Sequence, residues 1–346
     1  MKNFPPGTAP LPTLAGSEGW SAAGHACSHL QKHLKKLFPA RDFITGHAFE
    51  ICECSACGFT ITSPQPAGGD MAQYYPAGYY GTPEERRFPW IVEKLQRMLY
   101  AQRARSVEGA TDGVRGKVLD IGCGRGLLLK AFQARGWEVQ GTELSDQSAR
   151  YARQVAGIPV KTGNLGDIGF PANHFDAITM WHVLEHVPDP RVLLREIFRI
   201  LKPNGVLLVG VPDFGGWEAR LFRDKWFHLD VPRHVTHLTK DTLHKALSDT
   251  GFTAESWSGF APEYDLFSFV QSALNRCGLQ HNLLYNLLRG KQAKVIDGGR
   301  TPFWQVPGTF VLAVPMTLLG LPVTTIAGMA VQGGTVTVVA RKPAGD

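Results

Sequence analysis

A glycine-rich turn between two acids is the part of this sequence whose residue types and spacing could do chemistry. In VLDIGCGRG, residues 118–126, Asp120 ends an apolar run and glycines follow at every second position. Glycines let the backbone approach a ligand closely, and an acid at a strand end can hold a cation or a hydroxyl. Glu143 stands 23 residues after Asp120, at the end of the next apolar run. From there a carboxylate can accept hydrogen bonds from both hydroxyls of a ribose, so the pattern predicts a nucleotide-like ligand.

The spacing of the glycines distinguishes this turn from a dinucleotide-binding one. A dinucleotide-binding turn reads G-x-G-x-x-G. Here Gly122, Gly124 and Gly126 read G-x-G-x-G. A glycine-rich turn alone is a weak signal, and the two acids at adjacent strand ends make it more specific.

An alternation of strands and helices is predicted to position these residues. The apolar runs predict strands at 117–122, 138–144, 175–182 and 206–212, and the runs between them predict helices at 126–136, 145–157 and 189–205. A helix at 238–252 and strands at 253–260 and 335–342 follow. This repetition predicts an α/β fold with a doubly wound parallel sheet, whose ligands lie at the carboxyl ends of its strands.

The motifs between residues 116 and 213 resemble the class I S-adenosylmethionine-dependent methyltransferases. They are VLDIGCGRG, GTELS, GNLGDIGFPANHFDAITMWHVLEHVPDP and LKPNGVLLVGVPD, in that order. The resemblance implies a Rossmann-like sheet of seven strands, S-adenosylmethionine as cofactor and S-adenosylhomocysteine as product. The acceptor implied is a small or lipid-linked molecule, quinone-like or saccharide, methylated on oxygen or carbon. The alternative is a non-catalytic, membrane-associated binding or scaffold protein that keeps the methyltransferase fold.

The same resemblance assigns roles around the cofactor. The turn would face the methionine part, Glu143 the ribose, and Asn164 with Leu165 the adenine. Family members often have Asp where Asn164 stands, and an Asn oxygen can still accept a hydrogen bond from the adenine amino group. Trp181 and His182 would close over the cofactor. The residues assigned to the turn are Asp120, Gly122, Cys123, Gly124 and Gly126.

A general base is needed only when the acceptor is a hydroxyl, and His is the usual choice near neutral pH. The segment WFHLDVPRHVTHLT, residues 226–239, resembles a stretch that overhangs the acceptor pocket in a bacterial subgroup of these enzymes. We therefore predict His234 and His237 as base or acceptor contacts, with Trp226 and Arg233 as pocket walls. The alternative is that these His residues cap or pack the following helix. Glu185 and His186 are expected to support the fold.

Three crowded cysteines indicate a small N-terminal module over residues 26–66. Cys54 and Cys57 have the C-x-x-C spacing of half a zinc site, and the same subgroup has a zinc module here. Cys27 and one His would complete it, because a second C-x-x-C is missing. The alternative is a module that has lost its metal or holds buried thiols. A flexible arm over 1–25 precedes it, and a linker with a lead-in helix over 67–115 joins it to a methyltransferase domain over 116–346.

An apolar insertion is predicted at 264–332, before the last strand. No charged residue stands between Arg300 and Arg341, while residues 266–300 hold five Lys or Arg against one Asp, a net charge of +4. This composition is typical of peripheral membrane contact. Pro315, Gly320 and Pro322 would break the segment into a shallow hairpin. The alternative is a buried helix pair that packs against the domain or a second subunit.

Composition limits the remaining function classes. With 346 residues, 44% hydrophobic and 19% charged, the chain is a folded protein and not a disordered one. Its 36 Lys and Arg against 30 Asp and Glu, without a basic patch interleaved with aromatics, argue against a nucleic-acid partner. Six Cys without a disulfide framework predict a reducing compartment. No apolar run of signal-peptide length begins the sequence, so we expect a cytoplasmic protein at the inner face of the membrane.

Overall fold

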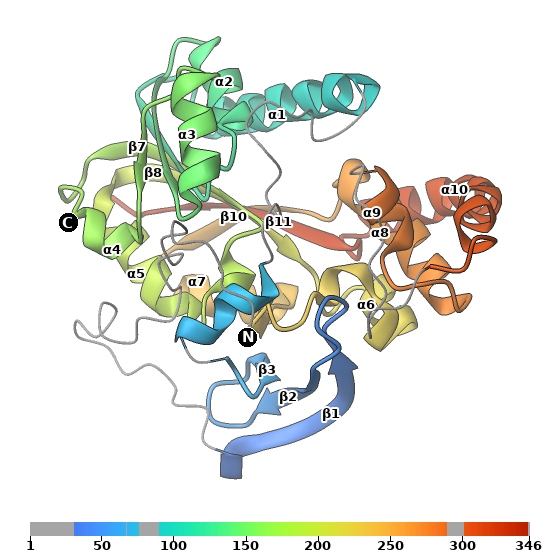
Figure 1. Ribbon diagram of the computed structural model, residues 1–346. Helices are drawn as coiled ribbons and strands as arrows, with labels where there is room; N and C mark the ends of the chain where they lie inside the picture. Colours follow the sequence, from blue (N-terminus) through green and yellow to red (C-terminus); the bar gives the residue numbers. More distant parts are fainter. Residues whose placement is uncertain (1–30, 67, 76–89, 289–300, 345–346) are drawn as a thin grey trace, which may run out of the picture.

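A seven-stranded sheet forms the centre of the computed structural model, which describes residues 31–66, 68–75, 90–288 and 301–344. The strand order is β10-β11-β8-β7-β4-β5-β6, and β11 runs antiparallel to both of its neighbours. The predicted α/β fold with a doubly wound sheet is confirmed (Figure 1). The strands are β4 (Lys117–Ile121), β5 (Glu138–Glu143), β6 (Val160–Thr162), β7 (Phe175–Trp181), β8 (Leu201–Pro212), β10 (Thr253–Ser258) and β11 (Thr335–Arg341).

Helices cover both faces of this sheet because its strands are apolar on both sides. In β4, Val118 packs with α1–α3 in one core, while its neighbour Leu119 packs with α5 and α7 in another. Alternate side chains of one strand therefore hold the two helical layers. The helices are α1 (Trp90–Ala110), α2 (Leu127–Gln133), α3 (Asp146–Gln154), α4 (Leu165–Ile168), α5 (Pro190–Ile200), α6 (Trp217–Phe222) and α7 (Lys240–Asp249).

Local sequence signals set most helix starts, and one predicted helix end is wrong. Ser145, Asp189 and Thr239 cap α3, α5 and α7 with side-chain oxygens, as such residues commonly do. The helix predicted to reach residue 205 ends at Ile200. Lys202 precedes a proline, which disfavours helical backbone, and Asn204 has a φ of 62°. The chain therefore enters β8 earlier than the Asn-Gly stop signal indicated.

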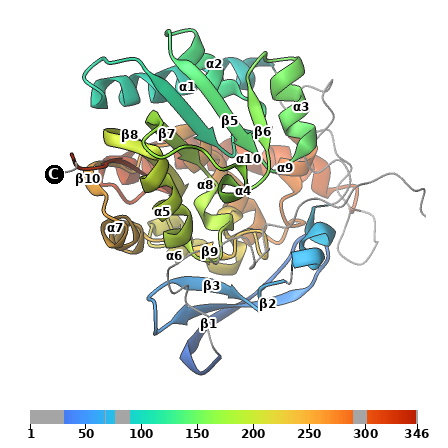
Figure 2. The ribbon, with the colours of Figure 1, turned by 90° about the vertical axis from the view of Figure 1, so that its left-hand side faces the viewer.

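The N-terminal module is a second, four-stranded sheet that a strand of the main domain completes. Its order is β1-β2-β3-β9, where β9 (Thr236–His237) comes from the segment after the central β8. Figure 2 shows this sheet below the central one, with β9 above β3. The two parts therefore share a sheet, although we predicted them as separate segments. The other strands are β1 (Leu34–Arg41), β2 (Ala48–Cys54) and β3 (Thr60–Ser63), and the 3-10 helices are η1 (Gln31–His33), η2 (Gly68–Tyr74), η3 (Leu184–His186), η4 (Arg223–Lys225) and η5 (Phe227–Leu229).

The insertion between β10 and β11 is helical, and its apolar part is one continuous helix. It contains α8 (Pro262–Arg276), α9 (Leu283–Leu288) and α10 (Gln305–Met329). The predicted shallow hairpin is wrong, because α10 runs through Pro315 and Pro322. A proline inside a helix costs about 3 kcal/mol or more, and packing of α10 against α8 offsets this cost. Gly320 lies so close to α8 that an added Cβ would stand 2.5 Å from Cδ1 of Phe269.

Candidate active site

A cavity of about 760 Å³ lies at the carboxyl ends of β4 and β7. Its inner end is formed by the glycine-rich turn after β4, and its walls come from α1, α8, α9, α10 and the N-terminal module. Apolar and aromatic side chains dominate these walls, with several His among them. The lining includes Phe43, Tyr100, Asp120, Gly122, Cys123, Gly124, Trp181, His182, Phe227, His228, His234, Tyr264, Phe267, Tyr285, Ala313 and Thr317.

The turn has the backbone that its glycines predict. Gly122 and Gly124 have φ values of 67° and 53°, in the left-handed region that favours glycine. A Cβ on Gly122 would stand 2.5 Å from Cγ2 of Val183, whereas a Cβ on Gly124 would meet nothing within 4 Å. The cavity side of Gly124 is therefore open to a ligand. Gly126 also has a positive φ and begins α2 as its N-cap, outside the cavity lining.

Glu143 ties the second strand end to this turn. One of its carboxylate oxygens accepts a hydrogen bond from the backbone N–H of Gly124 and the other from that of Ser145, both at 2.8 Å. The carboxylate is thereby held beside the turn, although Glu143 is not among the residues that line the cavity, and its role toward a ribose stays a prediction. Asn164 and Leu165 lie after β6, at the start of α4; Asn164 donates to Asp167, and Leu165 is buried in the core. Neither lines the cavity.

Asp120 is a buried acid at the inner end of the cavity. Burial raises its pKa to about 7, although the Thr179 hydroxyl, which donates to it at 2.6 Å, acts in the opposite direction. The nearby Glu143 carboxylate raises the pKa further. A cationic group placed against Asp120 would favour its ionised form. The open space at Gly124 and this acid together fit the methionine part of S-adenosylmethionine, whose ammonium and sulfonium groups are positively charged.

His182 and Glu185 form a hydrogen-bonded pair at the cavity wall. Nδ1 of His182 donates to Oε1 of Glu185 at 3.1 Å, because an ionised carboxylate can only accept. Burial alone would raise the pKa of Glu185, but the hydrogen bond and the charge of His182 outweigh it and lower that pKa to about 2. The remaining ring nitrogen, Nε2 of His182, is buried without a hydrogen-bond partner in the described part of the chain.

The backbone of His182 is also unusual. Its φ of 52° is rare for a residue other than glycine, and its N–H donates to the carbonyl of Gly210 on β8. Its ring packs against Tyr264 at 4.4 Å and His228 at 5.4 Å between ring centroids. Strained backbone of this kind collects at functional sites, where the surrounding structure holds it. We predicted His182 as a cofactor contact, and its pairing with Glu185 was not predicted.

His228 and His234 line the cavity with neutral rings. Burial lowers the pKa of His234 to about 4, and it lowers that of His228 well below its usual range. Nδ1 of His234 donates to the carbonyl of His228 at 2.7 Å. A ring with so low a pKa is a weak base at neutral pH. Of the two predicted bases, His234 and His237, only His234 lines the cavity. Its low pKa makes it better suited to packing than to proton transfer.

Three other predicted residues lie outside the cavity lining. His237 is buried in β9, where Nε2 lies 2.9 Å from the Thr62 hydroxyl and burial lowers its pKa to about 3. Trp226 is buried beside Glu218. Arg233 is fully buried and pairs with both Asp42 and Asp230. Arg233 therefore holds the β1–β2 turn, whose Phe43 forms part of the cavity wall.

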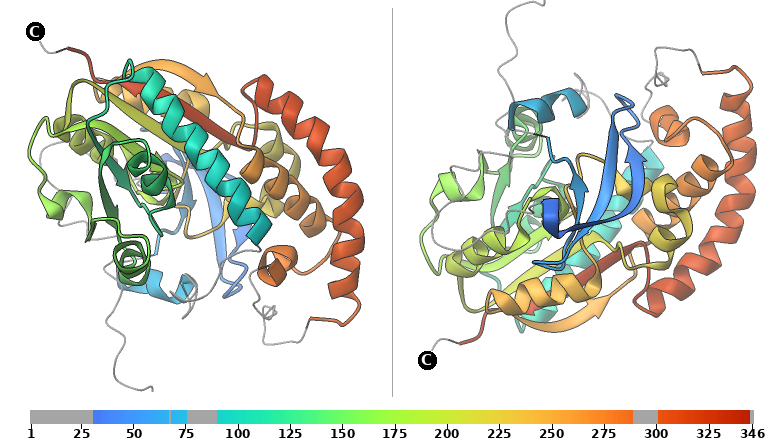
Figure 3. Two further views of the ribbon diagram at one scale, coloured as in Figure 1. Left: turned by 90° about the horizontal axis from the view of Figure 1, so that it is seen from above. Right: turned by 90° about the horizontal axis from the view of Figure 1, so that it is seen from below.

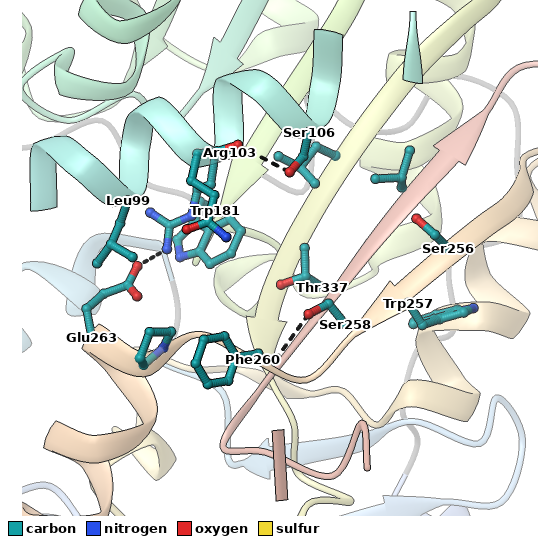
Figure 4. A pocket seen from close by; sticks show the side chains of 14 residues that line it. Leu99, Arg103, Ser106, Trp181, Ser256, Trp257, Ser258, Phe260, Glu263 and Thr337 are labelled. Carbon is teal, nitrogen blue, oxygen red and sulfur yellow. Dashed lines mark hydrogen bonds and ion pairs between the residues drawn. The ribbon is translucent and has the colours of Figure 1, made fainter. Parts of the chain in front are cut away.

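Trp181 separates the main cavity from a smaller one of about 180 Å³ between α1 and the β10–β11 edge. The Arg103 guanidinium lies 3.6 Å from the centroid of the Trp181 ring and pairs with Glu263 at the start of α8. Figure 4 shows Arg103 between these two side chains, below α1. The contact fixes the Trp181 ring, which lines both cavities, and it ties α1 to the insertion.

Zinc binding by the cysteine module stays a prediction. Cys54 ends β2 and Cys57 lies in the following turn, where the N–H of Gly58 donates to the carbonyl of Cys54. Within the described residues, no third Cys, His or carboxylate joins these two thiols in a metal-sized cluster. Cys27, the predicted third ligand, lies outside the described residues.

Comparison with known proteins agrees with the fold. Residues 86–257 match the model of a methyltransferase domain family. The chain is 32% identical over 196 residues to a ubiquinone biosynthesis O-methyltransferase of Psychrobacter arcticus, covering 50% of this chain and 72% of that protein. It is 41% identical over 108 residues to the enzyme of that name from Idiomarina loihiensis, covering 29% and 44%. It thus spans between about half and three quarters of the relatives it matches.

A solved structure of a putative sarcosine dimethylglycine methyltransferase from Galdieria sulphuraria is 18% identical, with a TM-score of 0.48 over 74% of this chain and 91% of the other. The matched region contains β4, β5, β6, β7, β8 and the glycine-rich turn after β4, while β11, the antiparallel strand between β8 and β10, follows it in the sequence. From the sheet, the turn and the match to the Psychrobacter protein, the chain belongs to the class I S-adenosylmethionine-dependent methyltransferases.

Proposed function

We propose that this protein transfers a methyl group from S-adenosylmethionine to a hydroxyl oxygen on an apolar, quinone-like ring. One observation carries the proposal: a single cavity joins the glycine-rich turn to an aromatic chamber, with the free Nε2 of His182 buried between its walls. The names of the relatives, ubiquinone biosynthesis O-methyltransferases, support oxygen as the methylated atom and a quinone-like ring as acceptor.

The turn holds the cofactor in this proposal. Asp120 and the backbone at Gly122 and Gly124 take the methionine part, and Glu143 takes the ribose hydroxyls. When bound, S-adenosylmethionine supplies an electrophilic methyl on a sulfonium, which leaves as the neutral thioether of S-adenosylhomocysteine. Most of the acceleration then comes from alignment of the acceptor with that methyl, an effect worth up to roughly 7–11 kcal/mol. The packed walls of the cavity provide this alignment.

His182 is the general base. Its Nδ1–H is held by Glu185, so the lone pair is on Nε2, the atom left without a partner. The Nε2 atom takes the hydroxyl proton as the bond between oxygen and methyl forms, and the ionised Glu185 stabilises the resulting imidazolium. General-base assistance of this kind is typically worth about 10²–10⁴-fold. His228 and His234 are weaker bases, because burial holds the pKa of each ring below its usual range.

The walls favour an apolar ring over a saccharide. Phe43, Phe227, Tyr264, Phe267 and Tyr285 contribute rings to the lining, with Leu and Val residues between them. Saccharide hydroxyls need many polar partners, and leaving them unpaired on burial is costly. An aromatic acceptor buries its faces against these rings and presents one polar edge to His182.

The test uses the full chain, S-adenosylmethionine with an isotopically labelled methyl, and a dihydroxybenzene that carries a short isoprenoid tail. The matched control acceptor has both hydroxyls already methylated. We expect one labelled methyl on oxygen of the first acceptor and none on the control, as read by mass spectrometry and NMR. Label on carbon would overturn the O-methyl assignment. Absence of transfer to any phenolic acceptor, by protein that binds the cofactor, would favour the non-catalytic scaffold.

A further inference from the structure

The outer face of α10 is an apolar surface without a protein partner in the described part of the chain. This helix is long and apolar enough to cross a membrane, yet only 11% of its most apolar stretch is buried. Val311, Val314, Leu318 and Leu321 follow one another at helical spacing, and Leu318 is 72% exposed. Just before the helix, Phe303 is 88% and Trp304 is 53% exposed. We call this set of residues the α10 face.

The inner side of α10 is built for packing on the protein. Thr309, Gly320, Thr324 and Gly328 are its buried residues, all of them small. They let α10 approach α8 and the turn after β10 closely, where an added Cβ on Gly328 would stand 2.9 Å from the Phe260 ring. Small residues inward and large apolar residues outward reverse the usual pattern of a surface helix. Water is therefore a poor solvent for the outer side.

Packing along its length fixes the orientation that α10 can take in a bilayer. The buried residues Thr309 to Gly328 span about 29 Å of helix, close to the thickness of a bilayer core. A perpendicular helix would carry α8 into the hydrocarbon with it. The start of α8 holds the charged residues Glu263 and Asp265, and Gln271 and Asn275 follow. The helix therefore fits a bilayer only when it lies along the surface, with the α10 face downward.

Charge near this face suits an anionic surface. No Asp or Glu occurs between residues 298 and 345, so no acid of the α10 segment repels a phosphate. Lys94 and Arg97 are exposed on α1, beside the exposed Leu95 and Met98. Arg276 is exposed at the end of α8. Basic side chains around an apolar patch are the usual composition of a membrane-interface site.

The mouth of the cavity lies between α1 and α10. Asp120 lines its inner end and is buried, whereas Leu95 of α1 and Thr317 of α10 line it and are exposed. The left view of Figure 3 shows α10 as the orange-red helix at the right-hand edge, while α1, in teal, runs diagonally across the molecule. A molecule that enters the cavity from this side passes beside the α10 face.

We propose that the α10 face docks on an anionic lipid bilayer, with α10 lying in the plane of the head groups, and that the acceptor enters the cavity from the bilayer between α1 and α10. Docking stands on the α10 face and on the charge around it. The second part, uptake of the acceptor, rests on the proposed function. A lipid-linked ring would keep its tail in the bilayer and bring its hydroxyl to His182.

Flotation of the full chain with vesicles tests the docking. The vesicles contain phosphatidylcholine with phosphatidylglycerol, or phosphatidylcholine alone. The bound fraction of the Val314→Gln/Leu318→Gln variant should be at least about tenfold lower, because the variant loses apolar area on the α10 face. Both side chains are exposed, so replacing them should not disturb the fold. Val155→Gln, at a similarly exposed residue just after α3, is the control and should bind like the wild type. Lys94→Gln/Arg97→Gln should lose about tenfold on anionic vesicles only, with Lys35→Gln/Lys36→Gln as its control.

A second copy of the chain is the competing occupant of the α10 face. Light scattering of the lipid-free protein therefore accompanies the flotation. A dimer that Val314→Gln/Leu318→Gln dissociates, together with no flotation of the wild type, would overturn the docking proposal. Equal flotation of wild type and this variant would also overturn it.

Uptake is tested separately from methyl transfer. The Val314→Gln/Leu318→Gln variant should methylate a water-soluble short-tailed acceptor at the wild-type rate and a long-tailed acceptor in vesicles at least about tenfold more slowly. Equal rates on the long-tailed acceptor would contradict uptake from the bilayer. Failure of the wild type on the soluble acceptor would instead contradict the proposed function and leave the flotation result standing.

Discussion

Nδ1 of His182 lies 3.1 Å from Oε1 of Glu185, and this pair connects the end of β7 to the short helix η3 that follows it. Both residues are in the segment WHVLEHV, three positions apart. The same segment therefore places Trp181 in the wall between the two cavities and His182, the base that we propose, in the lining of the larger one. The positive φ of His182 turns the chain at this point.

Replacing His182 separates its two candidate roles. The His182→Gln variant should lower kcat by about 10²–10⁴-fold, because the hydroxyl proton loses its acceptor. Its dissociation constant for S-adenosylmethionine should stay within about threefold of the wild type. Steady-state kinetics with a short-tailed acceptor and calorimetry measure the two quantities. Loss of cofactor affinity with unchanged kcat would instead support the cofactor contact predicted from the sequence.

The His237→Gln variant is the matched control for this test, because His237 is the predicted base that the structure places in β9. We expect it to lower the free energy of unfolding by about 1–3 kcal/mol, since Thr62 loses a buried hydrogen-bond partner. Its kcat should remain within about threefold of the wild type. A kcat loss as large as that of His182→Gln would contradict the assignment of the base.

The raised pKa of Asp120 predicts a pH-dependent cofactor affinity. A cationic ligand prefers the ionised carboxylate, and the free protein protonates Asp120 below its pKa of about 7. The dissociation constant for S-adenosylmethionine should therefore rise as pH falls below 7, approaching about tenfold per pH unit. Calorimetry across this range measures it. The Asp120→Asn variant should bind weakly with a flatter pH dependence; an equal slope in both proteins would exclude Asp120 as its source.

Arg233 should matter for stability more than for acceptor binding. It is fully buried, donates to Asp42 at 2.9 Å and to Asp230 at 2.6 Å, and joins the N-terminal sheet to the main domain. The Arg233→Met variant leaves the buried Asp42 and the partly buried Asp230 without their cation, so the free energy of unfolding should fall by about 3–5 kcal/mol. Urea denaturation measures it. Arg199 is more exposed and pairs with Glu196. The Arg199→Met variant, which breaks that pair, should lower the free energy of unfolding by at most about 1 kcal/mol.

If Arg233→Met is as stable as the wild type and has a raised KM for the acceptor, Arg233 does not act through stability. That result would support the role in the pocket wall that we predicted for Arg233 from the sequence.

Glu218 should make stability fall as the pH rises. Burial raises its pKa to about 8, although Ser268 and Trp226 donate hydrogen bonds that act the other way. The pKa of Glu218 is higher in the folded state than its value of 4.5 in the unfolded chain. Between pH 4.5 and pH 8, Glu218 is therefore protonated in the folded state and ionised in the unfolded chain. This contribution to the free energy of unfolding is complete below pH 4.5 and disappears towards pH 8. Denaturation of wild type and Glu218→Gln across that range measures it, and identical slopes would contradict the prediction.

The fold and the cofactor turn could be predicted from the sequence because their signals are local. Apolar runs, capping residues and the spacing of Gly122 and Gly124 are all read within a few residues. The same holds for Asp120 and Glu143, whose places at strand ends follow from the alternation. The end of α5 was missed because a proline effect at Lys202 outweighed the Asn-Gly signal.

The remainder of the site depends on contacts between distant segments. His237 and Arg233 belong to a segment that completes the N-terminal sheet, and no local pattern shows that β9 pairs with β3. Phe43 lies in the cavity wall next to Asp42, which Arg233 binds from 191 residues away, and its ring stacks on His281. The continuity of α10 also depends on packing, since Pro315 and Pro322 alone indicate a break.

The most direct test of the central claim is calorimetric titration of S-adenosylmethionine into the full-length protein, with Asp120→Asn and Glu143→Gln as variants. We predict micromolar binding at one site in the wild type and a loss of at least about tenfold in each variant, because each removes a carboxylate that we propose to hold the cofactor. Folding of all three proteins is checked by circular dichroism. A folded wild type that binds no S-adenosylmethionine, or variants that bind as tightly as the wild type, would contradict the account.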